Sequence, residues 1–325
     1  MRVFKFALLK SLRMLALMLA VAVVSFVLVQ FAPIDPVQAY VGGNAAVSAE
    51  QRERIAEYWG LNDPPAERFV KWGSALLRGD LGESKIYKRP VADVIGERFA
   101  ASIALMAVAW VFSGVFGFLL GMVSAAHRGR FLDRAVKWLC LTLSSTPVFW
   151  FGLLMLMVFS VWLGWTPIGL SVPIGEAGAA SFGARLAHMV LPALTLSITS
   201  LGPIALHTRA KLLDVMDSDF MLYARARGER GFGLYLRHGA RNIVLPAITL
   251  QFASFGELFG GSVLAEQVFS YPGLGQAATQ AGLRGDLPLL MGVVLCMALF
   301  VFLGNLTANI LYGVIDPRIR KGAEA

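Results

Sequence analysis

The sequence predicts an all-α integral membrane protein with six transmembrane helices, and three observations support that fold class. Of the 325 residues, 57% are hydrophobic and only 15% are charged, whereas a soluble domain carries about a quarter charged residues. Six stretches are apolar over the roughly 20 residues that a helix needs to cross a bilayer core about 30 Å thick. All 29 Lys and Arg residues lie outside these six stretches.

The six predicted spans follow one another along the chain. In order, they are about Met14–Phe31, Phe99–Ala126, Trp138–Leu163, Leu186–Leu206, Ile243–Ala265 and Leu289–Val314. Several are longer than a bilayer requires, which permits tilt without specifying it. The first run begins like a cleaved signal peptide, but it is long for a signal core, so we expect an uncleaved first helix. Gly114, Gly117 and Gly121 in the second span are expected to let a neighbouring helix approach closely.

Charge in the loops predicts which way the chain is inserted. Before the first span, after the sixth, and in the loops that follow the second and fourth spans lie 18 basic residues. The two short loops on the other side contain only two basic residues, Arg185 and Arg284. Because basic residues concentrate in cytoplasmic loops, both termini are predicted to be cytoplasmic. The net charge of +8 is then a topology signal rather than a nucleic-acid-binding patch.

Residues 1–325 are interpreted as a single transmembrane domain with a long outer loop at residues 32–98. In that loop, Ser48 and Gln51 can cap a helix that runs to Tyr58.

A second helix, Glu67–Leu77, is predicted in the same loop, after a break rich in Gly and Pro. Four large apolar residues lie near one face of it and are expected to pack on the membrane domain. They are Phe69, Trp72, Leu76 and Leu77. A compact outer cap and a docking surface for a partner are both compatible with this loop.

Several kinds of chemistry find no support in the sequence. Cys140 and Cys296 lie inside apolar runs and the four histidines are scattered, so neither a disulfide framework nor a metal centre is predicted. No phosphate-binding Gly-x-x-x-x-Gly-Lys-Ser/Thr motif occurs, so ATP would have to bind to another chain. The spans lack the paired Asp, Ser/His or metal-ligand motifs of an intramembrane enzyme. An ion-driven secondary transporter would carry several membrane-buried polar residues and inverted repeats, and only Glu257 fits that description.

Residues 207–242, predicted to be cytoplasmic, form the most informative stretch. It is rich in Arg and contains Ala224-Arg225-Ala226-Arg227-Gly228. A glycine after a helical run suits a helix end in the left-handed conformation. A short helix of this kind can dock into a groove of a partner, although an ordinary basic loop that only fixes topology would have the same composition.

This motif and the residues after it resemble the signature of ABC-importer permeases, most closely the dipeptide/oligopeptide/nickel branch. In that branch Ala-Arg-Ala-Lys-Gly precedes Arg-His-Ala-x-Arg-Asn and a Pro. Here Arg227 replaces the Lys and Gly239 replaces an Ala. Leu222-Tyr223 stand where the broader signature has Glu-Ala. Further segments in the matching order are similar to the same branch, namely Leu77–Ser84, Arg89–Val91, Gly261–Gly275 and Asp316–Arg320.

The resemblance implies an importer-type ABC transmembrane domain in a bacterial or archaeal cytoplasmic membrane. Such a chain forms half of a pathway for di- or oligopeptides delivered by a solute-binding protein. Nickel or metal-chelate uptake is the alternative within the branch. The implied partners are a second homologous permease, two ATP-binding subunits, the extracytoplasmic binding protein and membrane lipid, without nucleic acid. ATP and Mg²⁺ would bind to the partner subunits, and this chain would hold no cofactor, no metal and no catalytic residue.

The resemblance also implies roles for two groups of residues. The ATPase-coupling residues would be Ala224, Arg225, Ala226, Arg227 and Gly228. An outer gate, or a contact with the binding protein, would involve Glu266, Pro272, Gly273 and Gly275.

Glu257 is the one ionisable side chain near the middle of a predicted span. A charge at that depth is costly and normally faces a cavity or a partner. Glu257 would therefore meet a cationic part of a solute in the pathway, hydrogen-bond to a neighbouring helix, or be protonated.

Overall fold

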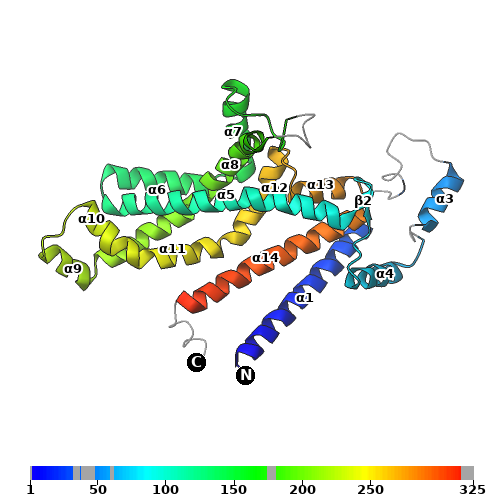
Figure 1. Cartoon of the computed structure of the whole chain (residues 1–325), viewed down its shortest axis with the longest axis horizontal. Helices are drawn as coiled ribbons and strands as arrows, with labels where there is room; N and C mark the ends of the chain where they lie inside the picture. The colour runs from blue at the N-terminus through cyan, green and yellow to red at the C-terminus, as the bar shows by residue number, and fades with distance from the viewer. Residues whose placement is uncertain (1, 32–36, 38–47, 59–61, 174–180, 316–325) are drawn as a thin grey trace. The chain divides into compact units, whose positions relative to one another are not determined.

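A computed structural model describes residues 2–31, 37, 48–58, 62–173 and 181–315 (Figure 1). The described residues are predominantly helical and fall into two compact units. Unit 1 comprises residues 1–102 and 272–302, and unit 2 comprises residues 103–271 and 303–325.

Four of the described helices are long and apolar enough to cross a membrane. They are α1 (Arg2–Gln30), α5 (Val91–Ala126), α8 (Phe182–Met216) and α14 (Leu287–Ile315). These helices contain the first, second, fourth and sixth predicted spans, but α5 begins well before Phe99 and α8 continues well past Leu206. Two bent helix pairs correspond to the other predicted spans, so the described residues support four to six crossings.

The third predicted span, Trp138–Leu163, is not one straight helix. It consists of α6 (Phe131–Ser144), α7 (Val148–Met155) and the π-helical turn η1 (Leu156–Trp162). The bend between α6 and the α7–η1 segment is 106°, and Figure 1 shows α7 leading away from the direction of α6. Pro147 lies at the break. Its ring removes an N–H donor and disfavours helical backbone at the preceding residue, which explains the bend.

The fifth predicted span, Ile243–Ala265, also bends. α11 (Arg241–Ala253) and α12 (Phe255–Val268) meet at 50° around Ser254. The Ser254 hydroxyl donates a hydrogen bond to the backbone carbonyl of Gln251 at 3.1 Å, a local bond of the kind that bends helices. The bend places Glu257 in the first turn of α12.

Unit 1 contains two short helices and a hairpin from residues 32–98. They are α3 (Ala49–Tyr58), α4 (Pro65–Leu77) and the antiparallel strands β1 (Glu83–Ser84) and β2 (Arg89–Pro90), with Glu83 opposite Pro90 and Ser84 opposite Arg89. α1, the start of α5, α13 (Leu274–Leu283) and most of α14 complete the unit. Its core consists of Val91, Val94, Ile95, Leu274, Ala277, Ala281, Leu289 and Val293.

The capped helix predicted to run to Tyr58 is confirmed as α3. The backbone N–H of Gln51 donates to the Ser48 hydroxyl at 3.2 Å, and the backbone N–H of Ser48 donates to the Gln51 side chain at 3.3 Å. This reciprocal pair satisfies two N–H groups that the first turn of a helix leaves without helical partners.

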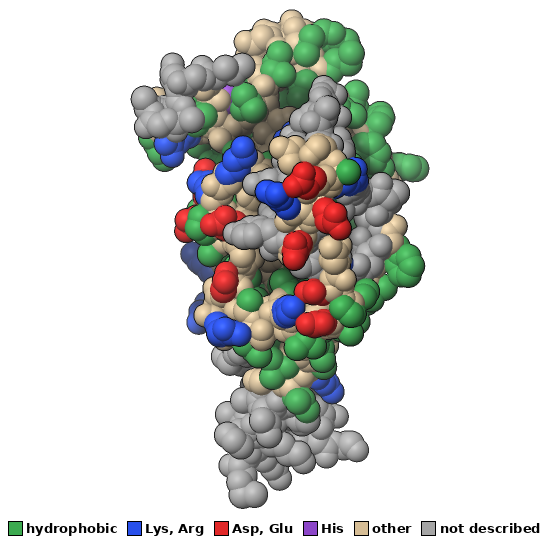
Figure 2. All heavy atoms as spheres, turned by 90° about the vertical axis from the view of Figure 1, so that its right-hand side faces the viewer, with side chains coloured by type: hydrophobic (Ala, Val, Ile, Leu, Met, Phe, Trp, Pro, Cys, Tyr) green, Lys and Arg blue, Asp and Glu red, His purple; other side chains and the backbone are tan. Residues whose placement is uncertain are grey.

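The second predicted helix of this loop is confirmed as α4, and it packs on α1. The rings of Phe69 and Phe26 lie 5.1 Å apart, edge to face, and Trp72 lies 5.8 Å from Phe69. The prediction was wrong for Leu77, which is 90% exposed because it ends the helix beyond the packed turns. Figure 2 shows acidic and basic side chains interspersed on the side of the molecule where α3 and α4 lie.

The hairpin is attached to the start of α14 by one buried carboxylate. Asp286 accepts hydrogen bonds from the Ser84 hydroxyl at 2.6 Å, from the backbone N–H of Ile86 at 3.0 Å and from that of Leu289 at 3.2 Å. Lys85 is buried beside it, and burial lowers the pKa of its ammonium group to about 8 although the Asp286 charge opposes that shift.

Unit 2 contains the rest of α5, the bent pairs, α8, the end of α14 and the elements between α8 and α11. Those elements are α9 (Asp219–Ala226), α10 (Phe232–Leu234) and the π-helical turn η2 (Tyr235–Ala240). The glycines of α5 allow close packing on α8, as predicted. A Cβ atom on Gly121 would lie 2.5 Å from the carbonyl oxygen of Ala205, and one on Gly117 would lie 3.0 Å from that of Leu201.

A buried ion pair fixes α8 to the first turn of α6. Arg209 donates to the two carboxylate oxygens of Asp133 at 2.6 and 2.9 Å. Asp133 is 1% exposed and also accepts from the Ser124 hydroxyl and the Gly129 backbone. Every lone-pair direction of this carboxylate is thus used, as a buried charge requires.

Candidate functional site

The predicted helix end at Gly228 is confirmed by the structure. α9 ends at Ala226, and Gly228 has a φ angle of +88°. The backbone N–H of Glu229 donates to the Ala224 carbonyl at 3.2 Å, and that of Gly228 donates to the Arg225 carbonyl at 2.9 Å. These two bonds form a Schellman motif, which needs a left-handed residue at the position of Gly228.

One face of α9 is anchored in unit 2 and the other is exposed. Met221 and Ala224, one turn apart, are buried at 0% and 5% exposure. The core beneath them contains Met122, Ala125, Leu212, Met216, Leu234 and Ile243. Of the five predicted coupling residues, only Ala224 is therefore buried; Arg225, Ala226, Arg227 and Gly228 are exposed.

Three large side chains of α9 that the sequence analysis did not assign to the site also lie on its surface. Phe220, Leu222 and Tyr223 are 45%, 66% and 67% exposed. The spacing of Met221 and Ala224 in the sequence was the available signal, because it places the residues between them on the opposite face. The exposed surface of α9 thus combines two arginines with apolar and aromatic groups.

The chain that follows α9 is held by a Glu–His contact. The His238 Nε2 and Glu229 Oε2 atoms are 2.9 Å apart. This hydrogen bond is the main cause that lowers the pKa of the Glu229 carboxyl group, with a further contribution from Arg237. Asn242 donates to the His238 carbonyl at 2.7 Å, a bond that joins η2 to the first turn of α11.

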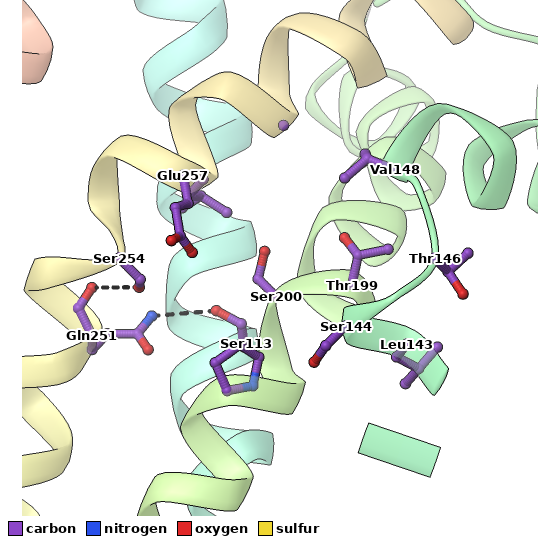
Figure 3. Close-up of a pocket in the computed structure, with 13 residues that line it drawn as sticks. Ser113, Leu143, Ser144, Thr146, Val148, Thr199, Ser200, Gln251, Ser254 and Glu257 are labelled. Carbon is purple, nitrogen blue, oxygen red and sulfur yellow. Dashed lines mark hydrogen bonds between the residues drawn. The ribbon is translucent and has the colours of Figure 1, made fainter. Parts of the chain in front are cut away.

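A polar pocket of 180 Å³ in unit 2 contains Glu257 (Figure 3). Side chains from α5, α6, α8, α11 and α12, and from the link between α6 and α7, line it. Its polar lining consists of Glu257, Gln251 and the hydroxyl groups of Ser113, Ser144, Thr146, Thr199, Ser200 and Ser254. Figure 3 shows the Glu257 carboxylate extending from α12 into this space, toward which the Ser200 hydroxyl also points. The structure thus places Glu257 beside a cavity, one of the alternatives left open above.

Some of the polar groups around the pocket are already engaged. Gln251 Nε2 donates to the Trp110 carbonyl at 2.7 Å and to the Ser113 hydroxyl at 3.2 Å, and the Trp110 indole donates to the Gln251 carbonyl at 3.0 Å. These bonds join α5 to α11 and fix the Gln251 amide. The Thr146, Thr199 and Ser254 hydroxyls donate to backbone carbonyls of their own segments.

Other polar groups of the pocket have no partner within the part of the chain that the structure describes. The buried Oε1 atom of Gln251 accepts no hydrogen bond there. Glu257, Ser144 and Ser200 make no side-chain hydrogen bond or ion pair with described residues. The pocket therefore offers a carboxylate, an amide oxygen and two free hydroxyls, and its lining includes no Lys, Arg or His.

The four residues predicted at an outer gate are buried or half-buried, whereas all the other candidates except Ala224 are exposed. In unit 2, Glu266 is only 1% exposed near the end of α12. In unit 1, Pro272 is half-buried, and Gly273 and Gly275 are buried around the start of α13. Their role as a gate or a binding-protein contact stays a prediction.

Comparison with known proteins places the chain in a family. Residues 117–321 match the family described as "Binding-protein-dependent transport system inner membrane component". The chain is 33% identical over 311 residues to the oligopeptide transport system permease protein AppB of Bacillus subtilis, covering 95% of this chain and 97% of that protein. It is 35% identical over 300 residues to the glutathione transport system permease protein GsiC of Escherichia coli K12, covering 92% and 94%.

These matches extend over nearly the full length of both chains and agree with the apolar helices and with the motif around α9. The protein described here belongs to the family of inner membrane components of binding-protein-dependent transport systems.

Proposed function

We propose that the chain is one permease subunit of an ATP-driven importer and forms half of its pathway for short peptides. The observation that carries this proposal is the near full-length similarity to permeases named for oligopeptide and glutathione transport. Glutathione is itself a short peptide, so both names favour peptides over nickel or metal chelates as the solute. A second homologous permease would supply the other half of the pathway, and an extracytoplasmic binding protein would deliver the solute.

Energy would reach the pathway through α9. Two ATP-binding subunits, which would hold ATP and Mg²⁺, would receive the exposed surface of α9 in a cleft. Its buried face, with Met221 and Ala224, supports this role because a helix fixed to the core transmits movement to the helices beneath it. ATP would then shift the pathway between two conformations by binding one of them better, and this chain would carry out no covalent chemistry.

The membrane orientation follows from the short-loop charges. We propose that both termini and α9 face the cytoplasm and that residues 32–98 face outward in the cytoplasmic membrane. Single cysteines in place of the exposed residues Glu50 and Tyr223 test this in a background without Cys140 and Cys296. A membrane-impermeant maleimide should label Glu50→Cys in intact cells and Tyr223→Cys only after the membrane is opened. The reverse pattern would overturn the orientation.

The function is tested on the complex that co-purifies with the tagged chain. Reconstituted in vesicles with its binding protein, that complex should take up labelled dialanine only when ATP is present on the side of α9. Uptake driven by an ion gradient without ATP would contradict the importer class. Uptake of Ni²⁺ but not of dialanine would replace peptides with metal as the cargo.

A further inference from the structure

The pocket around Glu257 has an unbalanced set of polar groups. The unengaged groups are hydrogen-bond acceptors, or hydroxyls that can accept: the Glu257 carboxylate, the Gln251 Oε1 atom and the hydroxyls of Ser144 and Ser200. The two N–H bonds of the Gln251 amide are directed to Trp110 and Ser113. The free polar groups of the pocket thus include more hydrogen-bond acceptors than donors.

The pocket also contains a carboxylate without a cation beside it in the described part of the chain. Glu257 has no cationic partner among the described residues, and none lines the pocket. An ionised carboxylate within a membrane is costly and normally faces a partner or a water-filled cavity. Two other carboxylates of unit 2 have cationic partners: Asp133 binds Arg209, and Asp217 lies 3.0 Å from Arg128. Glu257, which is exposed, differs from these two in having no cation beside it among the described residues, so it can receive a cationic group from outside the chain.

From these observations we infer that the Glu257 pocket binds a primary ammonium group of the transported solute. An ammonium group has one positive charge, three N–H donors and no acceptor, which complements a carboxylate with neighbouring amide and hydroxyl oxygens. The cavity of 180 Å³ is far larger than the space that one water needs, so it can admit the group with part of its solute. This inference names a solute group for the proposed function, and the second of the two tests below, which measures uptake, depends on that function. The ammonium group comes from either the amino end of a peptide or a lysine side chain.

The first test measures the charge preference of the pocket without transport. Ser200→Cys, in a chain with Cys140→Ala and Cys296→Ala, is treated in the assembled complex with aminoethyl methanethiosulfonate, which carries a primary ammonium, or with the anionic sulfonatoethyl analogue. The ratio of the two reaction rates should fall about tenfold when Glu257→Gln is added, because a charge-assisted hydrogen bond is lost. Asp93→Asn, which removes an exposed carboxylate from the first turn of α5, should leave the ratio unchanged.

Three results of the reaction-rate measurement, and one of a protection experiment on the same cysteine, would overturn the inference. They are an unchanged ratio in Glu257→Gln, the same fall in Asp93→Asn, and no reaction at Ser200→Cys with either reagent. Protection of the cysteine by Mg²⁺ but not by ethylammonium would also overturn it, since the site would then select metal ions.

The second test uses uptake to identify the source of the ammonium group. Glu257→Gln should raise the KM for dialanine about tenfold and leave uptake of acetyl-dialanine unchanged, and Glu257→Asp should restore part of the loss. If the KM for acetylated alanyl-lysine rises instead, the group bound is the lysine side chain. Equal losses for charged and uncharged peptides would refute ammonium recognition. If the wild-type complex moves none of these peptides while the reagent preference holds, the peptide proposal fails and the ammonium site stands.

Discussion

The segment around α9 and the pocket around Glu257 lie in the same unit but are built in different ways. The end of α9 is defined by hydrogen bonds between residues no more than five positions apart, such as Glu229 to Ala224. The pocket is assembled from residues between Ser113 and Gly261, which lie on several helices. A locally built site can be recognised from a short motif. An assembled site depends on contacts that no single segment encodes, and substitutions can separate the two cases.

The largest effect is expected where an assembled contact buries a charge. Arg209→Met removes the cation that is hydrogen-bonded to the buried Asp133 carboxylate and leaves only Lys137, whose Nζ atom lies 4.0 Å away, which should destabilise the protein by about 3–5 kcal/mol. The matched control is Arg128→Met, whose Asp217 partner is a surface group, so a loss below about 1 kcal/mol is expected. Thermal unfolding of the two purified variants measures the difference. Equal losses would mean that the Asp133–Arg209 pair does not fix α8.

The second effect concerns the assembled, buried site of unit 1. The pKa of Lys85 is lowered from 10.5 to about 8 by burial, so at neutral pH its charge costs stability, by roughly 2–3 kcal/mol. Between about pH 8 and 10.5 the folded state loses this proton first, and stability should rise with pH through that window. Lys85→Met removes the titrating group, so the stability of wild type relative to Lys85→Met should rise between about pH 8 and 10.5. Lys88→Met, in the same turn but exposed, should show no such trend; a constant difference between wild type and Lys85→Met would refute the assignment.

The third effect tests the locally built site. Gly228→Val places a β-branched residue at a φ angle of +88°, at a local cost of about 2 kcal/mol. Because each 1.4 kcal/mol corresponds to a factor of ten, we expect this cost to lower ATP-dependent uptake at least tenfold. Membrane insertion should persist. Gly233→Val is the control, because Gly233 is helical and a Cβ atom there meets no other group within 4 Å. Unimpaired uptake by Gly228→Val would show that the α9 end does not couple the ATPase.

The smallest effect concerns the hydrogen bonds that shape the pocket. Gln251→Met removes the bonds to Trp110 and Ser113 and should destabilise unit 2 by only about 1 kcal/mol, as is usual for such bonds in membranes. Thr307→Val is the control, since the Thr307 hydroxyl bonds only to the carbonyl of Leu303 in its own helix. Chemical unfolding in detergent compares the two variants. If Gln251→Met is no less stable than Thr307→Val, the bonds between α5 and α11 do not hold the pocket together.

The same contrast explains what could be predicted from the sequence. The capped start of α3, the glycine end of α9 and the close approach at Gly121 follow from local patterns and were predicted. The bend at Ser254 was not predicted. In the sequence, a serine whose hydroxyl will bond to the Gln251 carbonyl cannot be distinguished from any other serine in an apolar stretch. Pro147 was an available sequence signal for the break between α6 and α7, but the apolar stretch around it favoured one continuous span. Glu257 was identified by its charge alone, whereas Ser144, Ser200 and Gln251 are brought to it only by tertiary packing.

The bend at Pro147 has a consequence for the lipid around the protein. α6 has 14 residues, a length of about 21 Å, which is shorter than a hydrocarbon core of about 30 Å. α7 is bent by 106° from α6, so it adds no length along the axis of α6. Trp150 and Trp162 are 51% and 69% exposed, as is typical of residues that anchor a protein at the membrane interface. If α6 and α7 form one bent span, that span matches a locally thin bilayer. Hydrophobic mismatch would strain α6 and α7 before the longer helices, so the activity of the complex should depend on the acyl-chain length of the surrounding lipid.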